Sequence, residues 1–198
     1  MTITNTTIEI NEADEGGGIR NIGGTVSITG SFIQDNIGNG ISNANELTII
    51  GASITGNIAE SAGGGIATTL GNVTISNSTI SNNHGSNGGG VFVLTTSPGK
   101  KVTISNTTIS SNTTPNGGGG IFNRGTLMID SNTRILSNDA NRGGGVYNEL
   151  TIGTGDVTID DSTIASNSSQ DGGAIYNSGG VITVNGTLID DNEAVTSG

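Results

Sequence analysis

The stretch Lys101–Asn123, KVTISNTTISSNTTPNGGGGIFN, decides the fold because most of it recurs along the chain. The intervals between successive copies of its first part, VTISNTTISSN, run from 21 to 30 residues. A period of this length is typical of a solenoid, in which each repeat packs only against its neighbours. The eight copies begin at Met1, Val26, Leu47, Val73, Val102, Leu127, Val157 and Ile182.

A second marker, a glycine-rich run that ends in isoleucine or valine, follows every copy except the last. Apolar and polar residues alternate in segments such as Val73–Ile75, and the apolar ones are β-branched, which is typical of strands. The 35 glycines argue against helices, because each would cost about 1 kcal/mol inside one. The glycine-rich runs end at Ile19, Ile41, Ile66, Val91, Ile121, Val146 and Ile175.

The repeat length separates two all-β architectures. Hairpin arrays and propeller blades need longer strands and a period of roughly 40 residues. Coils of 21 to 30 residues with two or three short strands fit one turn of a parallel β-helix, whose strands stack on those of the next coil. We predict a single-stranded parallel β-helix solenoid of about eight coils, forming one domain over residues 1–198 without a linker.

Inward and outward positions follow from the strand alternation. Val73 and Ile75 are expected to point inward and Thr74 outward. Asn77 stands where other coils have Asn, Asp or Gly, which tolerate a left-handed backbone, so it marks a corner between two strands. After this corner each coil places one isoleucine in a predicted buried stack, made of Ile8, Ile33, Ile54, Ile80, Ile109, Ile135, Ile164 and Ile189.

An asparagine stands three residues after each of these isoleucines. Amides at the same corner of successive coils can bond to one another, which satisfies polar atoms that would otherwise cost about 1 to 3 kcal/mol each when buried. A ligand site would occupy one or two coils and not all of them, so we interpret the row as structural. The predicted asparagine ladder comprises Asn11, Asn36, Asn57, Asn83, Asn112, Asn138, Asn167 and Asn192.

The paired markers resemble a known class of repeat. Gly118–Ile121 (GGGI) and Ile109–Asn112 (ISSN) look like the GGAI and FxxN repeats of the polymorphic outer-membrane protein family, although this chain has Ile where Phe is usual. Gly172–Ile175 matches GGAI letter for letter. More broadly, the chain resembles the pectate-lyase-like superfamily of parallel β-helices. The resemblance covers the whole chain and implies a right-handed coil and a bacterial, surface-exposed or secreted, adhesin-like module.

The charge balance bears on the class of partner. The net charge is −11, and the six Lys and Arg do not cluster along the chain, which argues against nucleic acid. The same charge disfavours an anionic polysaccharide unless calcium bridges the two. Acidic outward residues are expected mainly to keep a β-rich surface soluble.

Composition is typical of an exported bacterial protein. No Cys is present, so disulfides and thiolate metal sites are unavailable. No apolar run approaches the roughly 20 residues of a membrane span, so we expect no membrane insertion of this segment. Residues 1–11 form a predicted strand pair without the basic region of a signal peptide. We expect an extracellular or cell-surface location, an export signal outside this segment, and either a longer repeat array or end-to-end self-association.

Two connections are longer than the others, Phe92–Lys101 and Tyr147–Asp156, and they lie two coils apart at the same corner. Insertions in solenoids tend to gather on the binding face. A glycan or a surface protein of the host or environment is the expected ligand, while neutral variation of surface loops is the alternative. The candidate binding residues are Leu94, Lys100, Lys101, Tyr147, Glu149 and Asp156.

Outward carboxylates form the one candidate for chemistry. Asp130 and Asp160 are expected to stack in neighbouring coils with Arg134 and Asp161 nearby. In a polysaccharide lyase or hydrolase on this fold, such carboxylates could hold calcium or act as acid and base, with a Lys or Arg as the proton-abstracting group. These coils contain no Lys, the sole histidine, His84, lies two coils earlier, and aromatic sugar platforms are missing. We therefore predict no enzyme activity and no cofactor, with calcium as an accessory only.

Rows of outward threonine and serine, such as Thr74 and Thr103, suggest a third function, because regular threonine rows on a flat β-face can order water as in an ice-binding solenoid. The rows are interrupted by Met128 and Asp130, and threonine is also a common exposed strand residue. We favour a non-catalytic structural or adhesin-like module, with a polysaccharide lyase or hydrolase and an ice-binding solenoid as alternatives.

Overall fold

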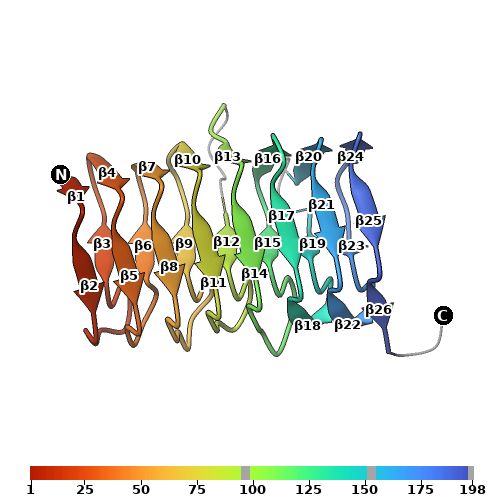
Figure 1. Ribbon diagram of the computed structural model, residues 1–198, viewed down its shortest axis with the longest axis horizontal. Coiled ribbons are helices and arrows are strands. Elements are labelled where there is room, and N and C mark those ends of the chain that lie inside the picture. Colours follow the sequence, from red (N-terminus) through yellow and green to blue (C-terminus); the bar gives the residue numbers. More distant parts are fainter. Residues whose placement is uncertain (95–98, 151–154, 196–198) are drawn as a thin grey trace.

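The computed structural model describes residues 1–94, 99–150 and 155–195. Their 26 strands form four parallel sheets, and these residues contain no helix. In Figure 1 each coil descends in front, turns at the bottom and returns behind to the top while the chain advances from left to right, which is a right-handed path. This is the usual hand for parallel strands joined by crossovers. The predicted right-handed parallel β-helix of about eight coils is confirmed.

Each of the first seven coils gives one strand to each of three long sheets, and the eighth gives strands to the first two. The first sheet contains β1 (Thr2–Thr4), β4 (Thr25–Thr29), β7 (Glu46–Ile50), β10 (Val73–Ser76), β13 (Val102–Ser105), β16 (Thr126–Asp130), β20 (Asp156–Asp160) and β24 (Ile182–Asn185). The second contains β2 (Thr7–Glu9), β5 (Phe32–Gln34), β8 (Ser53–Thr55), β11 (Thr79–Ser81), β14 (Thr108–Ser110), β17 (Arg134–Leu136), β21 (Thr163–Ala165) and β25 (Leu188–Asp190).

Each strand of the third sheet begins at the isoleucine or valine that ends a glycine-rich run. It contains β3 (Ile19–Asn21), β6 (Ile41–Asn43), β9 (Ile66–Thr68), β12 (Val91–Val93), β15 (Ile121–Asn123), β19 (Val146–Asn148) and β23 (Ile175–Asn177). A short fourth sheet lies at the corner between the second and third sheets in the last three coils. It contains β18 (Asp139–Arg142), β22 (Ser168–Asp171) and β26 (Glu193–Ala194).

Strand pairing places equivalent residues of successive copies side by side, as the repeat predicts. Val73 pairs with Val102, and Ile80 pairs with both Ile54 and Ile109. These side chains point inward and are at most 1% exposed. Full burial of one such side chain stabilises the fold by about 1.5 to 3 kcal/mol. One continuous aliphatic core therefore runs along the axis of the rod.

Two left-handed corners flank the second-sheet strand of each coil. The first was predicted from Asn77, whose φ is 52°. The second lies just before the ladder asparagine and was not predicted, because serine, aspartate and even Ile10 occupy it beside asparagine and glycine. Its members are Ile10, Asp35, Gly56, Asn82, Ser111, Ser137, Ser166 and Asp191, with φ between 50° and 68°.

Glycine is required in the glycine-rich runs for two separate reasons. Gly118 has a φ of 69°, where a side chain would strain the backbone. Gly120 has no such φ, but a Cβ there would lie 2.6 Å from the carbonyl oxygen of Gly145 in the next coil. The run therefore makes a tight turn and then brings consecutive coils into close contact at the entry to the third sheet.

Candidate functional site

The predicted asparagine ladder runs along the corner that follows the second sheet. Nδ2 of each asparagine donates to Oδ1 of the next at 2.8 to 3.0 Å, from Asn11 through to Asn192. Asn112 Oδ1 also accepts the backbone N–H of Asn83, and Asn112 Nδ2 also donates to the carbonyl of Ile80, each at 3.0 Å. Because the internal amides are fully bonded, the row supports the fold and offers no free group to a ligand.

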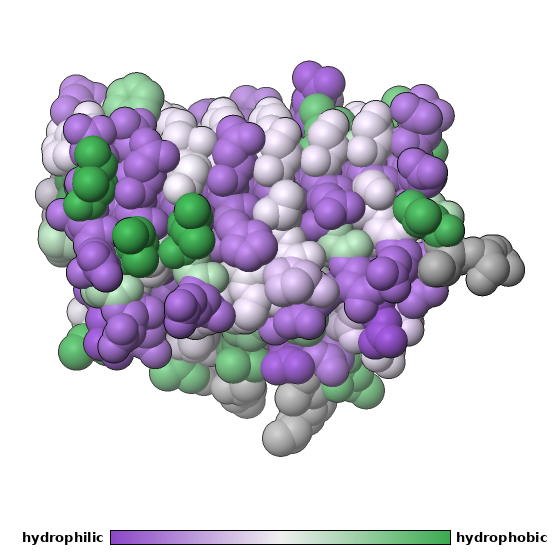
Figure 2. Space-filling view, turned by 90° about the horizontal axis from the view of Figure 1, so that it is seen from below, coloured by the Kyte–Doolittle hydropathy of each residue, from purple (hydrophilic) through white to green (hydrophobic). Residues whose placement is uncertain are grey.

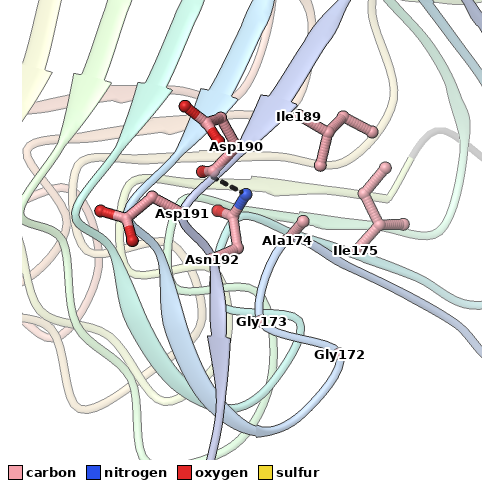
Figure 3. Close-up of a pocket in the computed structure, with 8 residues that line it drawn as sticks. All are labelled: Gly172, Gly173, Ala174, Ile175, Ile189, Asp190, Asp191 and Asn192. Carbon is pink, nitrogen blue, oxygen red and sulfur yellow. Dashed lines mark hydrogen bonds between the residues drawn. The ribbon is translucent and has the colours of Figure 1, made fainter.

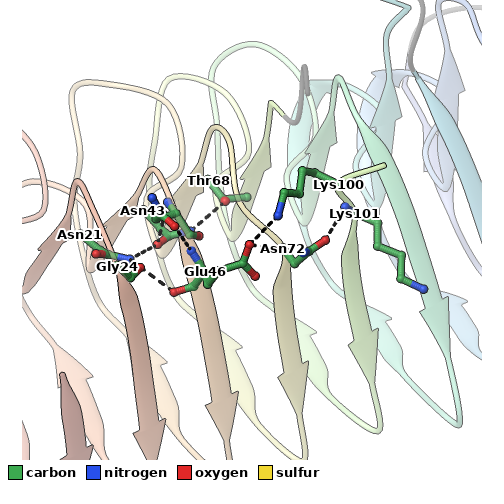
Figure 4. Close-up of polar contacts among 9 residues, drawn as sticks. Asn21, Gly24, Asn43, Glu46, Thr68, Asn72, Lys100 and Lys101 are labelled. Atoms are coloured by element: carbon green, nitrogen blue, oxygen red, sulfur yellow. Dashed lines mark hydrogen bonds and ion pairs between the residues drawn. The ribbon is translucent and has the colours of Figure 1, made fainter. Parts of the chain in front are cut away.

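A second polar row lines the interior of the third sheet and was missed in the sequence. Asn21 Nδ2 donates to Asn43 Oδ1 at 2.7 Å, and Asn43 Nδ2 donates to Thr68 Oγ1 at 3.2 Å (Figure 4). The sequence does contain a signal for this row. An asparagine stands two residues after most of the aliphatic residues that end the glycine-rich runs. The row comprises Asn21, Asn43, Thr68, Val93, Asn123, Asn148 and Asn177, so valine interrupts it once.

Four of the five aromatic residues of the chain form one column on the outward side of the third sheet. The ring centroids of Phe92, Phe122, Tyr147 and Tyr176 are successively 5.5, 4.6 and 5.2 Å apart, and neighbouring rings are within 28° of parallel. The first three residues are only 4 to 8% exposed, so mainly ring edges face the solvent. The sequence analysis did not predict this column, because strand register assembles rings that are 25 to 30 residues apart in sequence.

Basic residues also gather around this face, although they are scattered in sequence. Arg20 lies in β3, Arg124 directly follows β15, and Arg142 ends β18 at the corner before the third sheet. Lys100 and Lys101 lie at the opposite corner, just before β13. Five of the six Lys and Arg of the chain thus lie on the third sheet or at its two corners, spread over coils one to six.

Within the part of the chain that the structure describes, four of these five cations form an ion pair with a carboxylate. The ion pairs are Arg20–Glu15 at 2.8 Å, Lys100–Glu46 at 2.7 Å, Arg124–Glu149 at 2.5 Å and Arg142–Asp171 at 3.6 Å. The hydrogen bond from Lys100 lowers the pKa of the Glu46 carboxyl (Figure 4). The face therefore presents donors and acceptors in neutral pairs and carries no concentrated charge of one sign.

Two shallow hollows lie along this face, each of about 230 Å³. The first lies over coils one to four, and its lining includes Glu15, Arg20, Asn39 and Phe92. The second lies over the middle coils and joins an ion pair, amides and aromatic edges in the same way. Its lining includes Asn87, Asn116, Phe122, Arg124, Asn141, Arg142, Tyr147 and Glu149.

The candidate residues of the long connections fall around the second hollow and its corner. Leu94 packs against the aromatic column, Tyr147 belongs to it, and Glu149 holds Arg124. Lys101 donates its backbone N–H to Asn72 Oδ1 at 3.2 Å. Asp156 begins β20 and accepts the backbone N–H of Val181 at 3.3 Å. The central parts of both connections, residues 95–98 and 151–154, lie outside the described residues.

The candidate carboxylates lie on a different face. Asp130 and Asp160 end the neighbouring strands β16 and β20, and Asp161 is the left-handed corner residue with a φ of 45°. Asp160 Oδ1 accepts a hydrogen bond from Asn185 at 2.8 Å, whereas Asp130 Oδ1 is buried without a partner. Within the described ranges, no three His, Asp or Glu side chains converge as metal ligands would. Calcium binding by these aspartates stays a prediction.

His84 and the threonine rows complete the predicted features. His84 lies at the corner after the second sheet, where its Nδ1 is 2.9 Å from Thr113 Oγ1, and it is remote in the fold from β16 and β20. Thr74 pairs with Thr103 on the outward side of the first sheet, and Met128 follows in the same row. The rows are therefore in register, with the interruption that the sequence indicated.

Two other hollows differ in character from the third-sheet face. The corner after the second sheet in the first three coils has Ile37 and Ile58 exposed among acidic residues, including Glu12 and Glu60. Figure 2 views this corner and shows its apolar side chains as separate spots among hydrophilic ones. The hollow in Figure 3 is lined by Ile175, Ile189, Asn192 and their neighbours, whose counterparts in earlier coils form the core and the ladder.

Comparison with known proteins identifies the type of repeat. Two segments, residues 106–124 and 161–178, match the model of the Chlamydia polymorphic membrane protein repeat. The chain therefore contains repeats that resemble those of this family. Each segment runs from a left-handed corner, through the ladder asparagine and the glycine-rich run, to the third sheet, so the predicted resemblance is confirmed on those residues. Together they make up less than a fifth of the chain.

No curated protein and no solved structure matches the chain. The broader resemblance to the pectate-lyase-like superfamily stays a prediction. None of the described residues forms a helix that could cross a membrane.

Proposed function

We propose that the chain is a non-catalytic, adhesin-like β-helix module that a bacterium displays on its surface or secretes. The observation that carries the proposal is the match of two coils to a repeat named for a bacterial membrane protein. Both matched segments contain the residues that build the rod, so the likeness concerns the architecture.

The geometry supports a binding rod. Aliphatic stacks and asparagine ladders fill the interior of the described coils, so these coils differ mainly in their outward rows and corners. Solenoids of this kind present an elongated lateral surface to a partner. The third-sheet face carries the greatest variety of outward side chains, with aromatic edges, ion pairs and amides. We place the binding surface there, with a glycan or a protein of the host or environment as its partner.

The proposal assigns no catalytic step. Asp130 and Asp160 lie in coils that contain no lysine, and His84 is held against Thr113 at another corner. A lyase or hydrolase would need a base and an acid around one substrate bond, and the basic residues in these two coils, Arg134 and Arg142, belong to the second and fourth sheets, whereas the aspartates end strands of the first.

Surface display and adhesion test the proposal together. Antibodies against the folded chain should label intact cells of the source bacterium, and beads coated with the purified chain should adhere to cells or surfaces from its habitat. Beads coated with heat-denatured chain are the control. Labelling only after cell lysis, or equal adhesion of native and denatured beads, would contradict the proposal.

A further inference from the structure

The two hollows of the third-sheet face repeat one set of chemical groups along the rod. Each combines an arginine–carboxylate ion pair, Arg20–Glu15 in one and Arg124–Glu149 in the other, with asparagine amides and the edge of an aromatic ring. The arginines of the two ion pairs lie in β3 and directly after β15, four strands apart in the third sheet, which corresponds to roughly 19 Å. A ligand that fills both hollows must present the same kinds of chemical group more than once along its length, as a linear polymer does.

The charges indicate a neutral polymer. The arginines in both hollows are paired with carboxylates, and the whole chain carries a net charge of −11, so a polyanion would meet repulsion without a free cationic cluster. An ion pair offers donors and acceptors side by side, which suits adjacent hydroxyl groups. The Arg124 and Glu149 side chains are 37% and 30% exposed, so a ligand in the solvent can reach this ion pair.

The aromatic column gives the face rigidity. Arg124 lies over the Phe122 ring at 5.1 Å from its centroid, and Tyr147 stacks on the other rings at 4.6 and 5.2 Å. These contacts hold the polar groups in place before a ligand arrives, which lowers the entropy cost of binding. A few fixed polar groups above an apolar floor are the usual composition of a small-molecule site.

A peptide fits this face less well. The internal strands β6, β9, β12, β15 and β19 are each paired on both sides, so they have no open edge to which an extended peptide could add. Recognition must therefore come from side chains across the sheet. Side-chain amides and ion pairs suit a ligand rich in hydroxyl groups.

We propose that the third-sheet face binds a neutral oligosaccharide, with Arg124, Glu149, Asn116 and Asn141 forming the main subsite and Arg20 with Glu15 forming a second subsite. This assignment rests on the proposed adhesive function and names the ligand class for it.

The test uses the purified chain and a printed panel of neutral hexose and N-acetylhexosamine oligosaccharides with two to eight rings, together with uronate- and sialate-bearing counterparts. The decisive variant exchanges the partners of the main subsite, Arg124→Glu with Glu149→Arg, which keeps an ion pair but reverses its direction. The matched control reverses a polar pair on the second sheet, outside both hollows, Glu9→Gln with Gln34→Glu.

We expect the chain to bind at least one neutral oligosaccharide, and its affinity to fall tenfold or more in the main-subsite variant but less than twofold in the control. Exchange of Arg20 and Glu15 should weaken binding of long chains and leave disaccharide binding unchanged. Absence of neutral ligands from the panel hits, preference for the carboxylated glycans, or equal loss in the main-subsite variant and the control would each overturn the inference.

Bead adhesion separates this inference from the proposed function. If beads adhere but the panel is negative and the main-subsite variant adheres as well as the original chain, the glycan assignment fails while the adhesive function stands. If native beads adhere no better than denatured ones, the adhesive function itself fails.

Discussion

The two polar rows of the interior follow different rules. The row after the second sheet has asparagine in all eight coils, whereas the row in the third sheet has Thr68 and Val93 in place of asparagine. In the first row each Oδ1 accepts both a side-chain and a backbone N–H of the preceding coil. In the second row Asn123 Nδ2 also donates to the next coil, to Asn148 Oδ1 at 2.8 Å, but the backbone N–H that Asn123 Oδ1 accepts is that of Gly125 in its own corner. Asparagine is thus found in all eight coils in the row whose side chains bind the backbone of a neighbouring coil.

The largest expected effect is on the core that both rows share. Ile109→Asp places an unpaired charge at a fully buried position and should unfold the rod, because a buried charge without a partner is very costly. The outward variant Thr108→Asp is the control and should remain folded. Circular dichroism and solubility measure both. A soluble, unchanged Ile109→Asp protein would refute the inward assignment of the isoleucine stack.

The next test compares the two rows directly with the same substitution. Asn112→Val removes the acceptor of two N–H groups of Asn83 and a donor to Ile80, and should cost about 3 kcal/mol or more. Asn123→Val removes the contacts with the turn at Gly125 and a donor to Asn148, but leaves no backbone N–H of a neighbouring coil unpaired, and should cost about 1 to 2 kcal/mol. Urea unfolding measures both free energies of unfolding. Equal losses of unfolding free energy would mean that the two rows contribute equally to stability, which would contradict the difference in their hydrogen bonding.

A smaller effect is expected at the left-handed corner before the ladder. Ser111 has a φ of 55° and is exposed, so Ser111→Asn should raise the free energy of unfolding by roughly 0.5 to 1 kcal/mol, since asparagine tolerates this backbone better. Ser110→Asn, one residue earlier in β14, is the control and should give no gain. Equal free energies of unfolding for the two variants would contradict the prediction that serine strains the backbone at this corner.

The smallest effect concerns pH at the corner of the third sheet. Lys100 lowers the pKa of Glu46 below its ordinary value of 4.5, so the ion pair stabilises the folded chain above that pH and its contribution is lost as pH falls through the lowered value. Both side chains are more than a third exposed, so Glu46→Gln should cost only roughly 0.2 to 0.5 kcal/mol at pH 7.

The difference between the original chain and Glu46→Gln should disappear at pH values below the lowered pKa. Glu60→Gln, at a residue that forms no ion pair within the described ranges, controls for the loss of one negative charge. Thermal unfolding from pH 3 to pH 7 measures the effect. A difference that grows as pH falls would contradict the assigned direction.

Much of the architecture was accessible from the sequence because a solenoid repeats its local rules. The isoleucine stack and the ladder that ends at Asn192 could be read from one spacing, isoleucine followed three residues later by asparagine. The first left-handed corner was predicted, as at Asn77, because glycine, asparagine or aspartate occupies it in most coils. The second was missed, because residues that do not prefer this backbone, such as Ser111 and Ile10, occupy it in several coils.

The sequence by itself determined the strand type, the coil period and the inward positions, because β-branched alternation and the ladder asparagines are local and recur in each coil. The face on which Phe122, Tyr147 and Arg124 meet was decided only by the tertiary structure. Coils of 21 to 30 residues place residues that are distant in sequence at about 4.8 Å spacing, but which outward residues become neighbours depends on the register of every intervening coil. Because the connections between strands differ in length, that register cannot be read from the sequence and is known only once the strands are paired in the structure.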